Sequence, residues 1–475
     1  MIAGPLLLLV LPLAMAGIVY ILLRWTSVSA LLAVGTALAL GGAVVTLPLD
    51  QPVHFWGGRQ IAMGDAVTFF GRELILEQAD RSAMAFLFFA SAAIFFLAWR
   101  FAPRTLLLPM GLGLLSLLSG ALLIQPLIYA ALLVGIAAAL SVFALQAEEK
   151  APTRGGLRYL TFTILALPGL LVTHWLLERY ALTPDDTGLL GAAATLLALS
   201  FALLLGVAPF HTWVAAVASD SVPLAGTFVL TVGNGAVWFL LLDFLETYPW
   251  LGTHARFESL TLAAGLVMVV LGGLLAPAQR RLGPWIGYAA LVDSGAALMA
   301  LSTSGRLGVA LVVLSLLMRP FGLILMSAGL SGLRARSDGD DDLDSLRGLG
   351  RQARWSTAAL IFGGLSAAGL PVSAGFVSRW ALCRALAPSS PESALLLLLA
   401  GVGVMVGVWR ALSALLASPP ASENGGVSPQ VPPEGRLTAA VVAVAILACA
   451  GVGLFPQVLA PTAVRLAETY TFFIP

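Results

Sequence analysis

The sequence predicts an all-helical protein that crosses a membrane many times. Hydrophobic residues make up 59% of the 475 residues and charged residues only 10%, whereas soluble domains contain roughly 25% charged residues. Apolar runs close to the roughly 20 residues needed to cross a bilayer recur along the whole chain. Run length predicts about fourteen transmembrane helices, near residues 2–23, 28–49, 82–100, 105–124, 127–146, 158–178, 188–209, 222–246, 258–278, 284–303, 307–333, 355–384, 392–417 and 437–458.

The remaining segments divide these runs within a single integral membrane domain, residues 1–475. The first run has no basic residues before it and is long for a cleaved signal, so we expect a retained helix. Residues 50–81 are too charged to cross a bilayer, and the alternation over Glu73–Glu77 indicates a small surface hairpin. The stretch 334–354 is the most charged part of the chain, and residues 418–436, rich in Pro, Ser and Gly, are typical of a flexible loop.

The distribution of arginine predicts the orientation. Cytoplasmic loops of membrane proteins carry an excess of Lys and Arg. If both termini face the outer side, most of the Lys and Arg residues in the loops fall on the cytoplasmic side. Termini on the same side also require an even number of spans. The loops then placed in the cytoplasm carry Arg24, Arg100, Arg104, Lys150, Arg154, Arg158, Arg280, Arg281, Arg334, Arg336, Arg347, Arg351, Arg354 and Arg436, against Arg59, Arg72, Arg81, Arg179, Arg256 and Arg306 outside.

Composition also argues against several classes of function. The formal net charge is +1 and no basic cluster is present, so we expect lipid rather than nucleic acid as a partner. Cys383 and Cys449 both fall in apolar segments, and their spacing indicates neither a metal site nor a disulfide framework. No glycine-rich phosphate loop, nucleophile triad or nicotinamide fingerprint appears, so we expect no cofactor and no catalytic residue in this chain.

Lysine is almost absent. Of the 25 basic residues only Lys150 is a lysine, and it lies in a polar loop. A buried lysine can lose its proton near neutral pH, whereas arginine keeps its charge. The predicted membrane segments therefore lack one of the usual proton-relay groups.

The segment Gly369–Trp380 is the most informative motif. It places Pro371, Gly375 and Arg379 inside an otherwise apolar run. Proline removes a backbone donor and bends a helix, and a broken helix at membrane depth requires protein or water to satisfy its free backbone groups. A charged side chain beside such a break is a functional-site hypothesis.

Three further segments carry polar groups in apolar surroundings. Pro209–Trp213 places Pro209 and His211 directly after an apolar run. Asp341–Gly350 contains an acidic run followed by Arg, Gly and Leu, and it precedes the Gly369 break. Gly287–Gly295, which includes Asp293, follows Arg281 after a short apolar stretch.

Together these motifs resemble the antiporter-like subunits of respiratory complex I and their relatives, which include multisubunit cation/proton antiporters, membrane-bound hydrogenases and bicarbonate-uptake couplers. The resemblance covers residues from about 120 to 385. It implies two inverted five-helix repeats, each with a broken helix, and a hydrated axis of ionisable residues at mid-membrane. The implied division is residues 1–104 (first helices and outer loop), 105–246 and 258–417 (the two repeats), 418–436 (loop) and 437–475 (last helix).

The family's charged positions are largely replaced here. On this resemblance, a glutamate corresponds to Gly135, one lysine to Leu204 and a second lysine to Asn234. A histidine corresponds to Asp293, and the cation of the second broken helix is Arg379. The set implied by the resemblance thus has few groups that change protonation near neutral pH.

The candidate ion-path residues each allow two interpretations. Asp293 is a proton site or half of an ion pair with Arg319 or Arg379. Arg379 and Arg319, which precedes Pro320, face a hydrated interior or hold helices together. His211 shuttles protons or bonds a carbonyl freed by Pro209, and Asn234 binds channel water or a neighbouring helix.

These features lead to one functional expectation. We expect a non-catalytic membrane subunit of a complex I-like, redox-driven, ion-translocating assembly in the inner cell membrane. Its partners would be other integral membrane subunits and hydrophilic redox subunits. It conducts ions over a reduced path, or it serves as a non-pumping scaffold. The alternative is a component of a cation/proton antiporter or a solute-uptake system of the bicarbonate type.

Overall fold

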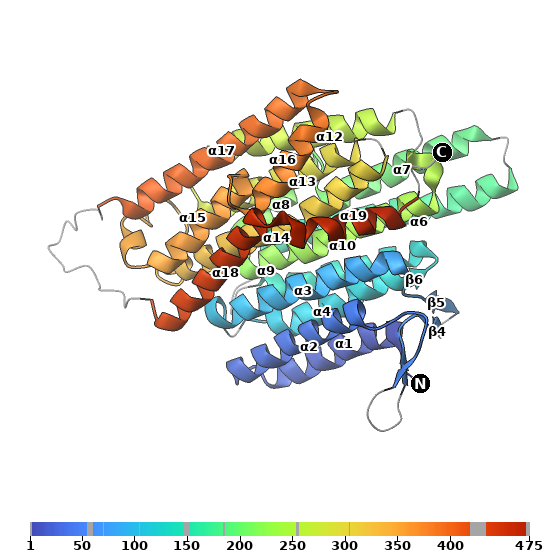
Figure 1. Cartoon of the computed structure of the whole chain (residues 1–475), viewed down its shortest axis with the longest axis horizontal. Coiled ribbons are helices and arrows are strands. Elements are labelled where there is room, and N and C mark those ends of the chain that lie inside the picture. The colour runs from blue at the N-terminus through green and yellow to red at the C-terminus, as the bar shows by residue number, and fades with distance from the viewer. Residues whose placement is uncertain are drawn as a thin grey trace.

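A computed structural model of the chain shows a bundle of long helices with two small sheets at one end (Figure 1). The structure describes residues 2–54, 60–69, 71–103, 105–146, 153–183, 186–252, 256–303, 305–418 and 434–471. Lys150 and most of the predicted loop 418–436 lie outside these residues.

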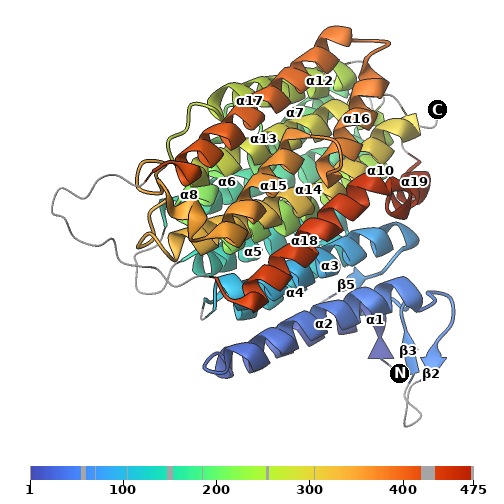
Figure 2. The ribbon, with the colours of Figure 1, turned by 60° about the vertical axis from the view of Figure 1, so that its left-hand side comes forward.

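The first four long helices form one side of the bundle. In order they are α1 (Gly4–Ile21), α2 (Thr26–Thr46), α3 (Gln78–Phe101) and α4 (Leu107–Leu123). Helix α1 packs on α4 and α2 packs on α3, and α1 and α2 lie at the edge of the bundle in both views (Figures 1 and 2).

Short strands occupy one end of these helices. The first sheet has the order β1 (Ile2–Ala3), β3 (Gln60–Ala62), β2 (Val53–His54). The second has the order β4 (Val67–Phe69), β5 (Arg72–Leu74), β6 (Ile124–Gln125). The pair β4–β5 is the surface hairpin expected in the polar stretch, but its second strand ends at Leu74 instead of continuing to Glu77.

The rest of the chain builds the main body of the bundle. Several of its helices are interrupted, by a π-helical turn (η2) and by breaks after α7 and α15. The elements are η1 (Leu127–Tyr129), α5 (Ala130–Leu145), α6 (Arg154–Leu182), α7 (Thr187–Leu205), α8 (Thr212–Asp220), α9 (Pro223–Phe228), η2 (Val229–Gly233), α10 (Asn234–Thr247), α11 (Pro249–Gly252), α12 (Phe257–Leu275), α13 (Leu282–Leu301), α14 (Gly305–Arg334), η3 (Leu349–Arg351), α15 (Arg354–Ala368), α16 (Ala374–Leu386), α17 (Pro391–Leu416), α18 (Arg436–Leu454), η4 (Pro456–Val458) and α19 (Ala460–Thr469).

The chain is a multi-pass, all-helical membrane protein. Twelve helices within the described residues are long and apolar enough to cross a membrane. Of the other predicted spans, 105–124 holds the shorter apolar helix α4, and 355–384 holds the two shorter helices α15 and α16. The count of fourteen spans and the two inverted repeats remain predictions.

Burial separates the central helices from the outer ones. The continuous segment α9–η2–α10 has 89% of its most apolar window buried, against 28% for α1 and for α12. Helices α13 and α14 are mostly buried as well. A helix buried on all sides lies in the centre of the bundle, so the residues of α10, α13 and α14 can meet away from the lipid-facing surface.

The two chain ends bear on the predicted number of crossings. Both ends of the chain lie at the same end of the bundle in both views, as an even number of crossings requires (Figures 1 and 2). Which side of the membrane that end faces remains a prediction.

Cys383 and Cys449 are buried free thiols, as expected from their apolar surroundings.

A buried carboxylate joins several helices at the opposite end from the chain termini. Asp341 is fully buried and pairs with Arg281 at 2.6 Å and with Arg334 at 2.5 Å. It also accepts the backbone N–H of Gly283 at 3.1 Å, in the first turn of α13. Arg334 in addition donates to the backbone carbonyl of Ser219 at 2.7 Å. Asp341 therefore fixes the start of α13, the end of α14 and the end of α8 relative to one another.

Replacing this carboxylate should destabilise the protein strongly. Asp341→Ala leaves two arginines without their shared partner, and such a loss costs about 3–5 kcal/mol of unfolding free energy. The measurement is thermal unfolding of the purified protein in detergent. Asp344→Ala in the same loop is the control, because Asp344 is exposed and pairs with Arg347 at the surface, and it should cost less than about 1 kcal/mol. Equal effects of the two substitutions would refute the anchoring role of Asp341.

Candidate functional site

The break between α15 and α16 sets the position of Arg379. Helix α15 ends at Ala368 and is capped by Gly369, whose φ of 78° is in the left-handed region that glycine adopts without strain. Pro371 cannot continue the helix, and α16 begins again at Ala374. The N–H of Gly375 donates to Ser366 Oγ at 3.1 Å, so a side chain of α15 satisfies one free donor at the start of α16.

Glycine at position 375 is required by close packing. A Cβ atom there would lie 1.9 Å from the backbone oxygen of Ser366. The two halves of the broken helix therefore touch along their backbones. The sequence-predicted break residues Pro371 and Gly375 both lie at the turn, and Arg379 follows on the second turn of α16.

Arg379 is buried and pairs with Asp293. Its Nη2 atom donates to Asp293 Oδ1 at 2.9 Å, and its Nη1 atom donates to the carbonyl oxygen of Ala368 at 3.2 Å. Asp293 lies on α13, so the ion pair links a central helix to the second half of the broken helix. The carbonyl of Ala368 is in the last turn of α15, where intrahelical donors are missing. One guanidinium thus contacts both halves of the break and α13.

Arg319 and Asn234 form a second buried pair. Arg319, only 7% exposed, donates from Nη1 to Asn234 Oδ1 at 2.7 Å and from Nη2 to the carbonyl of Ala290 at 3.4 Å. Asn234 follows directly after the π-helical turn Val229–Gly233. π-helical turns are rare and frequently occur at functional sites. The pair joins α10 to α14.

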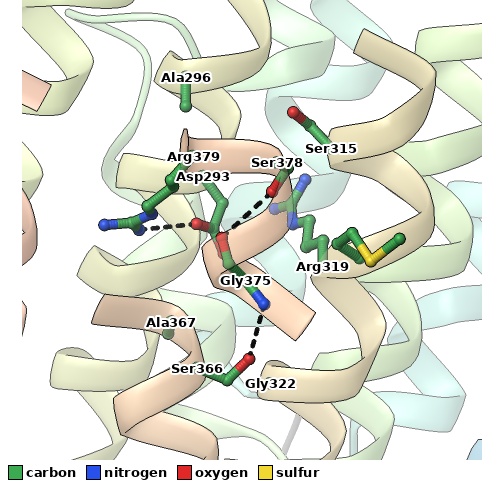
Figure 3. Close-up of a pocket in the computed structure, with 11 residues that line it drawn as sticks. Asp293, Ala296, Ser315, Arg319, Gly322, Ser366, Ala367, Gly375, Ser378 and Arg379 are labelled. Carbon is green, nitrogen blue, oxygen red and sulfur yellow. Dashed lines mark hydrogen bonds and ion pairs between the residues drawn. The ribbon is translucent and has the colours of Figure 1, made fainter. Parts of the chain in front are cut away.

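A small cavity lies between the two pairs (Figure 3). It measures about 20 Å³ as the space open to the centre of a water molecule, which is enough for roughly one water-sized particle. Figure 3 shows the Asp293 carboxylate between the Arg379 and Arg319 side chains. The polar residues that line the cavity are Asp293, Arg319, Arg379, Ser315, Ser366 and Ser378.

The structure therefore brings together four of the five predicted ion-path residues from four helices. Asp293, Arg319 and Arg379 line the cavity, and Asn234 joins them through its hydrogen bond with Arg319. The fifth, His211, is not part of this group. It lies at the first break, between α7 and α8, where Gly206 has a φ of 68° and Pro209 follows. The Nδ1 atom of His211 is buried and has no hydrogen-bond partner among the described residues.

Two positions where the family resemblance implies charge are packed by apolar groups. Leu204 near the end of α7 is buried in the core. Gly135 on α5 is also buried, and a Cβ atom there would lie 2.6 Å from a methyl carbon of Leu167 on α6. Both positions are therefore surrounded by apolar packing and carry no charge.

Sequence reasoning did not identify the hydroxyl groups around the cavity or the π-helical turn. Ser315 lies one turn before Arg319 on α14, and Ser366 and Ser378 flank the break. The four-residue spacing between Ser315 and Arg319 is a signal that could have identified Ser315. No group of three or more metal-ligating side chains occurs among the residues that the structure describes.

The chain is similar to the membrane subunits of NADH:quinone oxidoreductases and Mrp antiporters. The family described as "NADH:quinone oxidoreductase/Mrp antiporter, TM" matches residues 164–406, about half of the chain. NADH-quinone oxidoreductase subunit N of Moorella thermoacetica is 29% identical over 278 residues, which cover 58% of this chain and 56% of that protein. The match thus spans little more than half the length of this curated relative.

Solved structures share the fold over almost the whole chain. A subunit of the Mrp complex from a Dietzia species has a TM-score of 0.78 at 16% identity, with 98% of this chain and 97% of that chain covered. A subunit of respiratory complex I from Thermus thermophilus has a TM-score of 0.74 at 18% identity, with 99% and 100% covered. At this identity the likeness establishes the fold.

The left-handed glycine at the break should not tolerate a side chain. In Gly369→Ala the new Cβ atom would lie 2.5 Å from Cδ of Arg379, at a φ that costs a non-glycine residue about 1–3 kcal/mol. We expect a loss of at least this size in the thermal unfolding of the purified protein, because Arg379 must also shift away from Asp293. Gly42→Ala in α2 is the control, since open space surrounds that position, and it should be neutral or slightly stabilising. Wild-type stability of Gly369→Ala would contradict the described turn.

Proposed function

Because this chain belongs to the NADH:quinone oxidoreductase/Mrp antiporter membrane-subunit family, we propose that it is a non-catalytic membrane subunit of a complex I-like, redox-driven, ion-translocating assembly. The observation that carries the proposal is the similarity of sequence to a subunit N combined with a shared fold along the whole chain of a complex I subunit. The hydrophilic redox subunits of such an assembly would hold the redox cofactors, and this chain would hold none.

The location and partners follow from the same proposal. We propose the inner cell membrane, with both termini on the outer side, as the arginine distribution favours. Other integral membrane subunits would cover part of the apolar outer surface. The proposed domain division keeps residues 105–246 and 258–417 as the two repeats, each containing one of the two observed breaks.

Within this assembly we propose that the chain couples or supports its neighbours without a serial proton relay of its own. A relay needs side chains that gain and lose protons near neutral pH. Both cations at the cavity are arginines, which stay charged. The single carboxylate that lines the cavity, Asp293, is held in an ion pair. Leu204 and Gly135 leave the first half of the bundle without charge at the positions noted above. A fixed positive charge also repels protons and other cations.

Co-purification tests the proposed assembly. We expect the chain, extracted from native membranes in mild detergent, to come down with integral membrane subunits and with hydrophilic subunits that carry iron–sulfur or nicotinamide sites. Mass spectrometry of the purified complex identifies them. Recovery with antiporter-type membrane subunits alone, or with a single soluble partner, would replace the redox-driven assembly by the antiporter or uptake alternative.

An Asp293→Asn variant tests the proposed absence of a relay. The ion pair with Arg379 is weakened, so we expect the amount of assembled complex to fall severalfold, in line with lost stability. The number of protons moved per electron in the complexes that still assemble should stay at the wild-type value. The amount of assembled complex is measured from its yield on purification, and proton movement is measured in proteoliposomes with a pH-sensitive dye. Asp344→Asn, an exposed Asp-to-Asn change, is the control.

A lower proton-to-electron ratio in assembled Asp293→Asn complexes would overturn this part of the proposal. It would assign Asp293 to a reduced proton path. If the Asp344→Asn control also lost assembly, the amount of assembled complex would respond to any Asp-to-Asn substitution and not to the Asp293–Arg379 ion pair in particular.

A further inference from the structure

The charges around the small cavity do not balance. Two arginines, Arg319 and Arg379, and one carboxylate, Asp293, line it. Arginine remains protonated even when buried, so the ionised site carries one net positive charge. An uncompensated charge in an apolar interior is costly, and buried charges in proteins are paired or otherwise compensated.

The unbalanced charge belongs to Arg319. Arg379 has an ion-pair partner in Asp293, whereas the hydrogen bonds of Arg319 go to neutral oxygens of Asn234 and Ala290. No carboxylate lies within ion-pairing distance of Arg319 among the described residues. Its Nε atom is buried and has no hydrogen-bond partner there. Arg319 therefore combines a buried positive charge with an unused donor.

The cavity beside Arg319 has the size and lining for one small particle. Its volume of about 20 Å³ accommodates roughly one water-sized particle. Tetrahedral anions such as phosphate and sulfate are therefore too large for it. The side chains of Ser315 and Ser378 also line the cavity, and a hydroxyl can rotate to donate to an anion. Asp293 keeps the net charge of the site at one, which a single monovalent anion neutralises.

We propose that this cavity binds one small monovalent anion of halide size, such as chloride, in contact with Arg319. The bound anion balances the second arginine and fixes α14 against the broken helix. Anion binding at this site goes beyond the proposed coupling role. It is tested by stability alone, so the test does not depend on ion translocation.

Halide-dependent stability is the first test. Thermal unfolding of the purified full chain, or of its native complex, is followed while potassium gluconate is replaced by potassium chloride or bromide at constant ionic strength. We expect a saturable rise of the unfolding midpoint with either halide, because a ligand that binds the folded state stabilises it. Equal midpoints in gluconate and in both halides would overturn the proposal.

Two substitutions with opposite expected effects locate the site. Arg319→Gln makes the site neutral and should abolish the halide response. Asp293→Asn raises the net charge to two and should tighten apparent halide affinity by at least about tenfold. Arg306→Gln, an exposed arginine on the same helix, is the matched control and should respond like wild type. A halide response retained in Arg319→Gln, or weakened in Asp293→Asn, would contradict the assignment.

Bromide can also be located directly, which keeps the proposal testable if Arg319→Gln does not fold. Crystals of the wild-type protein or complex grown in bromide should show an anomalous peak in this cavity, beside the guanidinium group of Arg319. Data with no peak at that position, while bromide appears elsewhere on the protein, would overturn the proposal.

Discussion

A cation buried inside an apolar helix bundle needs a compensating group, and this constraint organises the centre of the molecule. Arg379 meets it by pairing with Asp293 and by bonding the carbonyl of Ala368. The same contacts connect α13 to both halves of a broken helix, so charge compensation and helix packing depend on one another. Taking away Asp293 leaves Arg379 buried without its ion-pair partner, which costs several kcal/mol in typical proteins.

The broken helix makes this arrangement possible. A continuous helix would use its backbone groups internally, whereas the break leaves the carbonyl of Ala368 and the N–H of Gly375 available. The small residues at the turn let the two halves approach closely enough for Ser366 to cap the second half. At the other end of the bundle, Asp341 fixes the ends of three neighbouring helices through paired arginines. The polar residues around the cavity thus lie between the helix ends that Asp341 joins and the break between α15 and α16.

Much of this architecture follows from local sequence signals. Glycine and proline placed inside an apolar run predicted the break at Pro371, and a lone carboxylate in a span predicted that Asp293 needs a partner. Pairing with Arg379 was one of two alternatives, because sequence spacing alone does not fix which helices touch. The contact between Asn234 and Arg319 depends on the π-helical turn before Asn234. The apolar run predicted a continuous span over residues 222–246, and the π-helical turn within it was not predicted.

Asp293 and Arg379 act as one unit that holds the broken helix against α13. A double-mutant cycle on thermal unfolding measures it, using Asp293→Asn, Arg379→Gln and the double variant in the purified protein. We predict strong coupling, so that the double variant loses clearly less stability than the sum of the two single losses. Additive losses would contradict the claim, because they would mean that the two side chains contribute independently.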